Sequence, residues 1–183
     1  MLRIIHSAIA ILALYAFTLT HANAAGKNAE PLGLELGVVN YSQVERELGS
    51  QSALTQTGIN KFSNGRMFSA EAESLGIDGL NQVGLIFDQS DILVGVILTM
   101  RKDPRGVYKT LSGKYKTVTN RIDNFMNNGY AKLAKGDSII EVDAPHMSFV
   151  MEVRYLTKGF QAAFEKATKA EDAENQKRKA NAL

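Results

Sequence analysis

The amino-acid sequence predicts an α+β fold: a curved antiparallel sheet with short helices on one face and a C-terminal helix. The strongest observation is the stretch 83–100, where two β-branched and aromatic runs flank the polar break Asp88-Gln-Ser-Asp91, a pattern typical of a β-hairpin. A second observation is that three segments carry apolar residues at helical spacing. We expect their helices to cover one face of the sheet at about 41–48, 104–113 and 157–175.

Residues 1–24 have the pattern of a secretory signal peptide. Arg3 supplies a basic start, residues 4–19 form an apolar run, and Ala22-Asn-Ala24 is a small-x-small cleavage site. The run is shorter than the ~20 residues that a membrane span usually needs, and a retained N-terminal anchor is the alternative. Because no cysteine follows the run, a lipoprotein anchor is excluded, and the sequence predicts export to the periplasm.

The rest of the chain has the length of one domain. Residues 32–170 are long enough to bury a core, residues 25–31 predict a flexible tether, and residues 171–183 predict a polar helical tail. The chain has no cysteine, so packing alone must stabilise the fold. Its formal net charge of +2 at pH 7 is close to neutral, which argues against nucleic acid as a partner. No second apolar segment is long enough to span a membrane.

The first half contains one short helix with a clear start. Asn40 and Gln43 form a capping-box pattern at the beginning of the helix 41–48, and Gly49 ends it. The other segments before the central hairpin predict, in order, a short strand, a loop with one short strand, and a strand, at residues 32–37, 50–65 and 67–74.

Both faces of the central hairpin are predicted to be apolar. A turn centred on residues 89 and 90 places Gly84 opposite Gly95 and Ile86 opposite Leu93 on one face. Glycines inside strands either bend a sheet or let another chain approach closely, and both interpretations stay open here. The other face carries Val83, Leu85, Phe87, Ile92, Val94 and Val96.

The second half begins with a helix at Asp103-Pro104, because aspartate caps a helix and proline suits its first position. Strands are predicted after it at 115–122, 130–133, 138–143 and 149–156. The last two form a hairpin that alternates between a buried and a wet face. We expect core side chains at Ile140, Val142, Phe149, Met151, Val153 and Tyr155, and the wet face at Glu141, Asp143, Glu152 and Arg154.

The last segment, from Thr157, predicts a helix whose apolar stripe includes Phe160 and Phe164. Beyond Lys169 this stripe is lost, so we expect the helix to project into solvent or to fray. The chain thus contains, twice, a short helix followed by strands, which indicates a degenerate two-fold repeat.

Several segments carry a resemblance to a known group of domains: 34–37, 41–44, 48–49 and 85–88. In this order of strand, short helix, Leu-Gly and hairpin, the chain resembles the β-lactamase-inhibitor-protein-like exported α+β domains. That group includes the small lipoprotein of the outer-membrane barrel-assembly machine. The resemblance implies a module that binds proteins through an open sheet and its loops. The chain lacks the lipid-anchor cysteine, disulfides and tryptophan of these relatives, so no particular target carries over.

A search for catalytic residues finds few candidates. His146 is the only histidine after the signal peptide, and no Gly-x-Ser-x-Gly, phosphate-binding or dinucleotide motif is present. The best cluster is Glu141, Asp143 and His146, since two carboxylates and an imidazole are able to hold a divalent metal. The alternative is a polar strand end whose carboxylates form ion pairs with its neighbours. We expect no cofactor.

The sequence therefore favours a non-catalytic periplasmic protein that binds another envelope or secreted protein, as an inhibitor, an immunity protein or an envelope-assembly accessory. We expect the partner to contact the uncovered face of the sheet at Gly84, Ile86, Leu93, Gly95, Ile97, Glu152 and Arg154. One alternative is a small metal-dependent hydrolase or metal-binding protein that uses Glu141, Asp143 and His146. Another is a protein that carries a small apolar ligand between helices and sheet.

Overall fold

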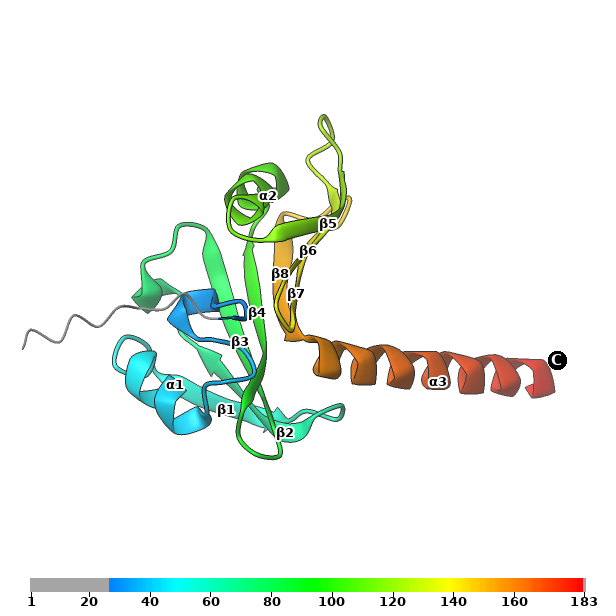
Figure 1. The fold of residues 1–183 in the computed structure, drawn as a ribbon. Coiled ribbons are helices and arrows are strands. Elements are labelled where there is room, and N and C mark those ends of the chain that lie inside the picture. The colour runs from blue at the N-terminus through cyan, green and yellow to red at the C-terminus, as the bar shows by residue number, and fades with distance from the viewer. Residues whose placement is uncertain (1–26, 183) are drawn as a thin grey trace, which may run out of the picture.

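Eight strands form one antiparallel sheet in the computed structural model, which describes residues 27–182 (Figure 1). The predicted α+β class is confirmed. The predicted signal peptide at residues 1–24 lies outside the described residues. Among the described helices, none combines the length and the apolar character needed to cross a membrane.

Each half of the sheet is a meander of four strands, and the two halves join in the middle. The strand order is β1-β2-β3-β4-β8-β7-β6-β5, so β4 and β8 are central and β1 and β5 are the edges. The predicted repeat stays a prediction. The strands are β1 Leu54–Ile59, β2 Asn64–Ala70, β3 Leu80–Asp88, β4 Leu93–Arg101, β5 Lys116–Ile122, β6 Gly129–Lys135, β7 Ser138–Ala144 and β8 Val150–Thr157.

Two short helices, α1 (Tyr41–Glu47) and α2 (Pro104–Ser112), cover one face of the sheet, which we call the inner face (Figure 1). The predicted capping box of α1 is present: the Asn40 side chain accepts from the Gln43 backbone N–H at 3.0 Å, and the Gln43 side chain accepts from the Asn40 N–H at 2.9 Å. Asp103 caps α2 by accepting from the Gly106 N–H at 3.1 Å. Polar side chains at the predicted positions thus fix both helix starts.

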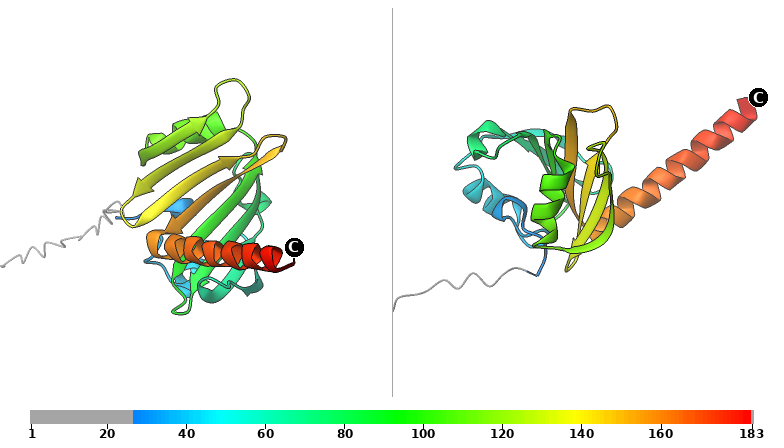
Figure 2. Two further views of the ribbon diagram at one scale, coloured as in Figure 1. Left: turned by 90° about the vertical axis from the view of Figure 1, so that its right-hand side faces the viewer. Right: turned by 90° about the horizontal axis from the view of Figure 1, so that it is seen from above.

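The long helix α3 (Lys158–Ala182) begins on the opposite face, which we call the outer face. In Figure 2 it lies in front of the sheet when the outer face is viewed, and it points away from the sheet when seen from above. The expectation that all three helices cover the same face of the sheet was therefore wrong for α3. The reason is the alternation of β8: Tyr155 points into the inner core, so Leu156 and the following Phe160 pack on the outer side.

The main core lies between the inner face and the helices. Val83, Leu85 and Phe87 of β3 are fully buried there, together with Val44 of α1. Tyr41 stacks on Phe68 with 4.7 Å between the ring centroids, which attaches α1 to β2. A smaller cluster on the outer face contains Ile86, Val94, Leu156 and Phe160.

Residues 28–31 belong to the fold, which corrects the predicted tether. Ala29 is fully buried, and its N–H donates to the Ser138 hydroxyl at 3.1 Å. The Asn28 side chain donates to the Leu36 carbonyl at 2.9 Å. The predicted strand at 32–37 is instead a 3₁₀ turn, η1 (Pro31–Gly33), followed by turns, and a second short 3₁₀ helix is η2 (Glu73–Leu75).

The β3–β4 hairpin has a different register from the predicted one. Ile86 pairs with Gly95 and Gly84 with Ile97, so the two glycines are not opposite each other. The Asp88 side chain accepts from the Ser90 and Ile92 N–H groups at 2.8 and 3.0 Å, which makes the turn longer than two residues. A bulge next to Ile86 then moves Val94 to the outer face and Leu93 to the inner one.

The β7–β8 hairpin confirms most of its predicted faces. Met151, Val153 and Tyr155 are buried, and Glu141 lies opposite Arg154 on the outer face. Phe149 was expected in the core but is 94% exposed. It belongs to the turn, which extends to the start of β8 at Val150 and so removes this side chain from the strand alternation.

Candidate functional site

The structure brings together only part of the predicted binding surface. Ile97, Glu152 and Arg154 lie side by side on the outer face, since Ile97 pairs with Arg154 and Thr99 with Glu152. Gly84 pairs with Ile97 at the border of the same surface. Three other predicted residues are largely buried. Ile86 packs against Phe160 of α3 and keeps only a small exposed area, which lines the groove described below. Gly95 lies against the Leu156 and Ile86 side chains and Leu93 is in the inner core, so we exclude these two from direct contact with a partner.

The first two turns of α3 cover part of the outer face and so form one wall of a groove. Phe160 is buried against Ile86 and Leu156. Phe164, 39% exposed, meets Phe62 of the β1–β2 loop edge to face, with 4.9 Å between the ring centroids. Such aromatic pairs favour this geometry because the positive ring edge meets the negative ring face. An ion pair of 2.6 Å between Lys61 and Glu171 joins the same loop to α3 further along.

The resulting outer groove has a volume of about 260 Å³. Its apolar walls come from the β1–β2 loop, three strands and α3, and its polar wall comes from β7, β8 and α3. Sequence reasoning missed the contributions of the loop and the helix, although the stripe of Phe160 and Phe164 was a usable signal. The lining residues are Asn60, Phe62, Ile86, Ile97, Glu141, Glu152, Arg154, Leu156, Phe160, Gln161, Phe164 and Glu165.

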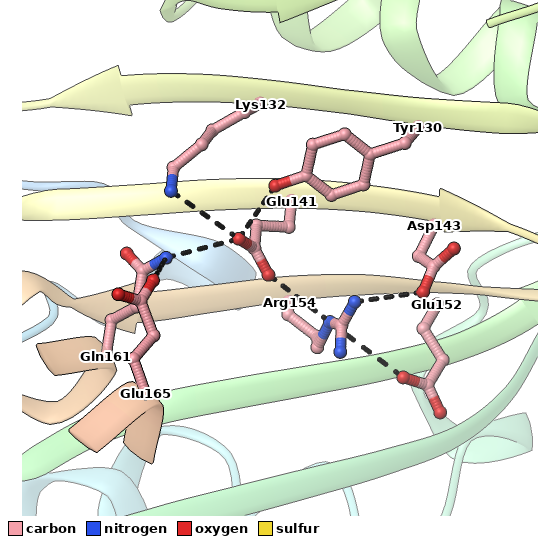
Figure 3. Close-up of polar contacts among 8 residues, drawn as sticks. All are labelled: Tyr130, Lys132, Glu141, Asp143, Glu152, Arg154, Gln161 and Glu165. Carbon is pink, nitrogen blue, oxygen red and sulfur yellow. Dashed lines mark hydrogen bonds and ion pairs between the residues drawn. The ribbon is translucent and has the colours of Figure 1, made fainter. Parts of the chain in front are cut away.

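Glu141 lies at the centre of the polar wall. We call this residue and the polar side chains connected to it the Glu141 network (Figure 3), which consists of Tyr130, Lys132, Glu141, Asp143, Glu152, Arg154, Gln161 and Glu165. Its carboxylate accepts hydrogen bonds from the Tyr130 hydroxyl at 2.8 Å and from the Gln161 amide at 3.2 Å. It also lies 3.7 Å from the Lys132 ammonium and 3.6 Å from the Arg154 guanidinium. Lys132, Glu141 and Arg154 are direct neighbours on adjacent strands, so the sheet register alternates their charges.

Arg154 connects this network to the open side of the groove. Its Nη2 donates to Asp143 at 3.0 Å, and its Nε lies 4.0 Å from the Glu152 carboxylate. Within the described chain, Nε is buried without a hydrogen-bond partner. The guanidinium is therefore held among three carboxylates, with donor capacity that the described residues leave unused.

Tyr130 is fixed as a hydrogen-bond donor. Burial, followed by its hydrogen bond to Glu141 and the charge of that carboxylate, raises the pKa of the Tyr130 hydroxyl well above its ordinary value. The phenol therefore keeps its proton, and with it the hydrogen bond to Glu141, to a higher pH than an exposed tyrosine does. This supports a structural role for the Glu141 network, because its donors and acceptors are directed at one another.

The predicted metal cluster is not formed. Glu141 and Asp143 are directed toward Arg154. His146 lies in the β7–β8 loop, and its ring nitrogen Nδ1 is 2.8 Å from the amide of Asn128 in the β5–β6 loop. Over residues 27–182, no group of three or more histidine, cysteine, aspartate or glutamate side chains is placed to hold a metal ion. The geometry thus gives no support to the metal-dependent alternative.

Both edges of the sheet are interrupted. The pairing of β1 with β2 shifts between Gln56 and Gly58, and that of β5 with β6 shifts between Thr117 and Thr119. Bulges of this kind disfavour the addition of a further strand. The outer groove is therefore a better candidate for contact than either edge.

Comparison of the sequence with protein families and curated proteins, and of the fold with solved structures, found no significant match. The resemblance to β-lactamase-inhibitor-protein-like domains stays a prediction. The candidate site is thus defined by its own geometry.

Proposed function

We propose that this protein is a non-catalytic, exported protein-binding module whose partner contacts the outer groove. One observation carries the proposal: six apolar side chains, three carboxylates and one guanidinium surround a single pocket of about 260 Å³. Hot spots of protein interfaces are commonly pockets of this kind, each filled by one anchor side chain. Export to the periplasm is supported by the pattern of residues 1–24 alone.

The charges of the groove favour a basic anchor. Glu141, Glu152 and Glu165 outnumber Arg154 in its lining. Lysine and arginine side chains combine an aliphatic stem with a cationic head, so the stem suits the apolar wall and the head suits the exposed Glu152 and Glu165. The exposed ring of Phe164 adds a surface for cation–π contact. We therefore expect the partner to insert a lysine or arginine from an exposed segment.

Site-specific photo-crosslinking in living cells tests this proposal. A photo-reactive phenylalanine analogue replaces Phe164 in the groove, and in a matched strain it replaces Val38, which is 53% exposed away from the groove. We expect one defined crosslinked protein at position 164 and none of that protein at position 38. Equal crosslinking of the same proteins at both positions, or no crosslink at 164, contradicts the proposal.

A second candidate function has an observation of its own. A cleft of about 480 Å³, the inner cleft, lies between α2 and the sheet and is lined by Leu98, Met100, Val107 and Tyr155 among others. Tyr155 is 6% exposed, and within the described chain its hydroxyl makes no hydrogen bond. Charged side chains also line this cleft, at Asp78, Arg101, Asp103 and Lys114. The cleft thus suits a small molecule with an apolar body and a polar group. Native mass spectrometry of the purified protein tests this candidate function. A carried molecule makes the native mass larger than the mass after denaturation, whereas equal masses contradict carriage.

A further inference from the structure

Two loops project from the same end of the sheet, beyond the end of the strands that line the outer groove. They are the β5–β6 loop (residues 123–128) and the β7–β8 loop (residues 145–149), which leave adjacent strands where Gly129 pairs with Ala144. A hydrogen bond of 2.8 Å between Asn128 and His146 joins them. The left view of Figure 2 shows both loops extending beyond the strands.

The tips of these loops present large apolar side chains to solvent. Phe125, Met147 and Phe149 are 92%, 94% and 94% exposed, and Met126 is 58% exposed. Isolated exposed apolar residues are ordinary, but four large ones at two adjacent tips form a patch that needs an explanation. The geometry of the turn does not explain the methionine at position 147. Met147 has φ 55°, in a region of backbone conformation that favours glycine and asparagine over methionine.

Hydrogen bonds hold both tips in place. The Asp123 carboxylate accepts from the Phe125 and Met126 N–H groups, each at 2.7 Å. The Phe149 carbonyl accepts from the Lys102 N–H at 3.0 Å. The apolar side chains are therefore presented on braced turns, so less ordering entropy is lost when they enter an apolar medium.

Basic side chains surround the base of the two loops. Arg105 donates to the Asn124 carbonyl at 2.6 Å, and Lys102 donates to the Pro145 carbonyl at 2.6 Å. Arg121 lines the shallow hollow between the loops together with Asn128 and other residues. Within the described chain, none of these three cations forms a salt bridge. The charge of Arg105 acts on the nearby Asp123 carboxylate, whose pKa it helps to lower, whereas no salt bridge within the described chain engages Lys102 or Arg121.

We propose that this end of the molecule binds the surface of an anionic phospholipid bilayer. Phe125, Met126, Met147 and Phe149 enter the interface between head groups and acyl chains, while Lys102, Arg105 and Arg121 contact the phosphates. The apolar side chains lie at the loop tips and the three cations lie nearer the sheet. A bilayer presents the matching order, since its anionic head groups lie outside its apolar acyl chains.

Vesicle co-sedimentation of the purified protein tests the proposal. We expect binding to vesicles of phosphatidylcholine and phosphatidylglycerol, weaker binding to phosphatidylcholine alone, and a decrease with salt. The double variant Phe125→Ser/Phe149→Ser should lower the partition coefficient at least about tenfold. The variant Arg105→Gln/Arg121→Gln should remove the preference for the anionic vesicles.

The matched control is Val38→Ser/Ile59→Ser, which removes two exposed apolar side chains (53% and 59%) near the opposite end of the strands and should bind like the wild type. Circular dichroism confirms that each variant is folded. Absence of binding by the wild type, or equal binding by Phe125→Ser/Phe149→Ser, overturns the proposal. Self-association that is abolished by this double variant also overturns it, because the tips would then contact a second copy.

Discussion

At the scale of single residues, the polar part of the outer face centres on one carboxylate, that of Glu141. Glu141 is contacted by a phenol, an amide and two cations within 3.7 Å. The sequence predicted the wet face that carries Glu141 and Arg154, since strand alternation depends only on local spacing. It did not predict Gln161 beside them, because that contact depends on which face α3 crosses.

Removing the Tyr130 hydroxyl should weaken the fold by a moderate amount. Tyr130→Phe deletes the 2.8 Å hydrogen bond to Glu141, and we expect a loss of about 1 kcal/mol in the free energy of unfolding. Urea denaturation followed by circular dichroism measures it. The control Tyr108→Phe removes an exposed hydroxyl that bonds to Thr117, and it should change stability much less. Equal effects of the two variants would contradict the account of the Glu141 network.

The same tyrosine predicts a dependence on alkaline pH. Burial is the first cause of the raised pKa of Tyr41, Tyr130 and Tyr155, so the native state holds these phenol protons more tightly than the unfolded state does. The stability gained is complete below the unfolded-state pKa of about 10 and is lost as the pH rises through the native-state values. In a tyrosinate absorbance titration, we expect these three residues to ionise later than in denaturant. Superimposable titrations would refute this.

At the scale of elements, α3 combines a packed base with a polar extension. Phe160 is buried at the base, whereas residues 172–181 are exposed. The predicted loss of the apolar stripe beyond Lys169 agrees with this exposure. The face that the helix would cover was not predictable, because a stripe shows which side of a helix is buried and not which face of a sheet receives it.

This division predicts unequal effects of two changes in α3. Phe160→Ala should lower the free energy of unfolding by about 3 kcal/mol, because it leaves a cavity against Ile86 and Leu156. A chain that ends at Glu171 keeps the ion pair to Lys61 and should lose less than about 0.5 kcal/mol. Urea denaturation compares them. A truncated chain as unstable as Phe160→Ala would show that the extension packs on the domain.

At the scale of the whole molecule, the features that depend on distant residues were the hardest to predict. The α+β class and both helix caps follow from local patterns. Ala29 was assigned to a tether because its burial depends on Ser138, more than a hundred residues later. The β3–β4 register depended on a longer turn around Asp88, and a single bulge was enough to move Leu93 off the outer face.

The central claim is that the outer groove receives a basic anchor from a protein partner. Isothermal titration calorimetry tests it most directly. The titrant is the purified partner that photo-crosslinking at position 164 identifies. Glu152→Lys/Glu165→Lys should weaken binding by at least about tenfold, because it replaces attraction with repulsion at the mouth of the groove. The control Glu47→Lys, an exposed charge reversal on α1, should leave the affinity unchanged. Equal affinities of the wild type and the groove variant would contradict the claim.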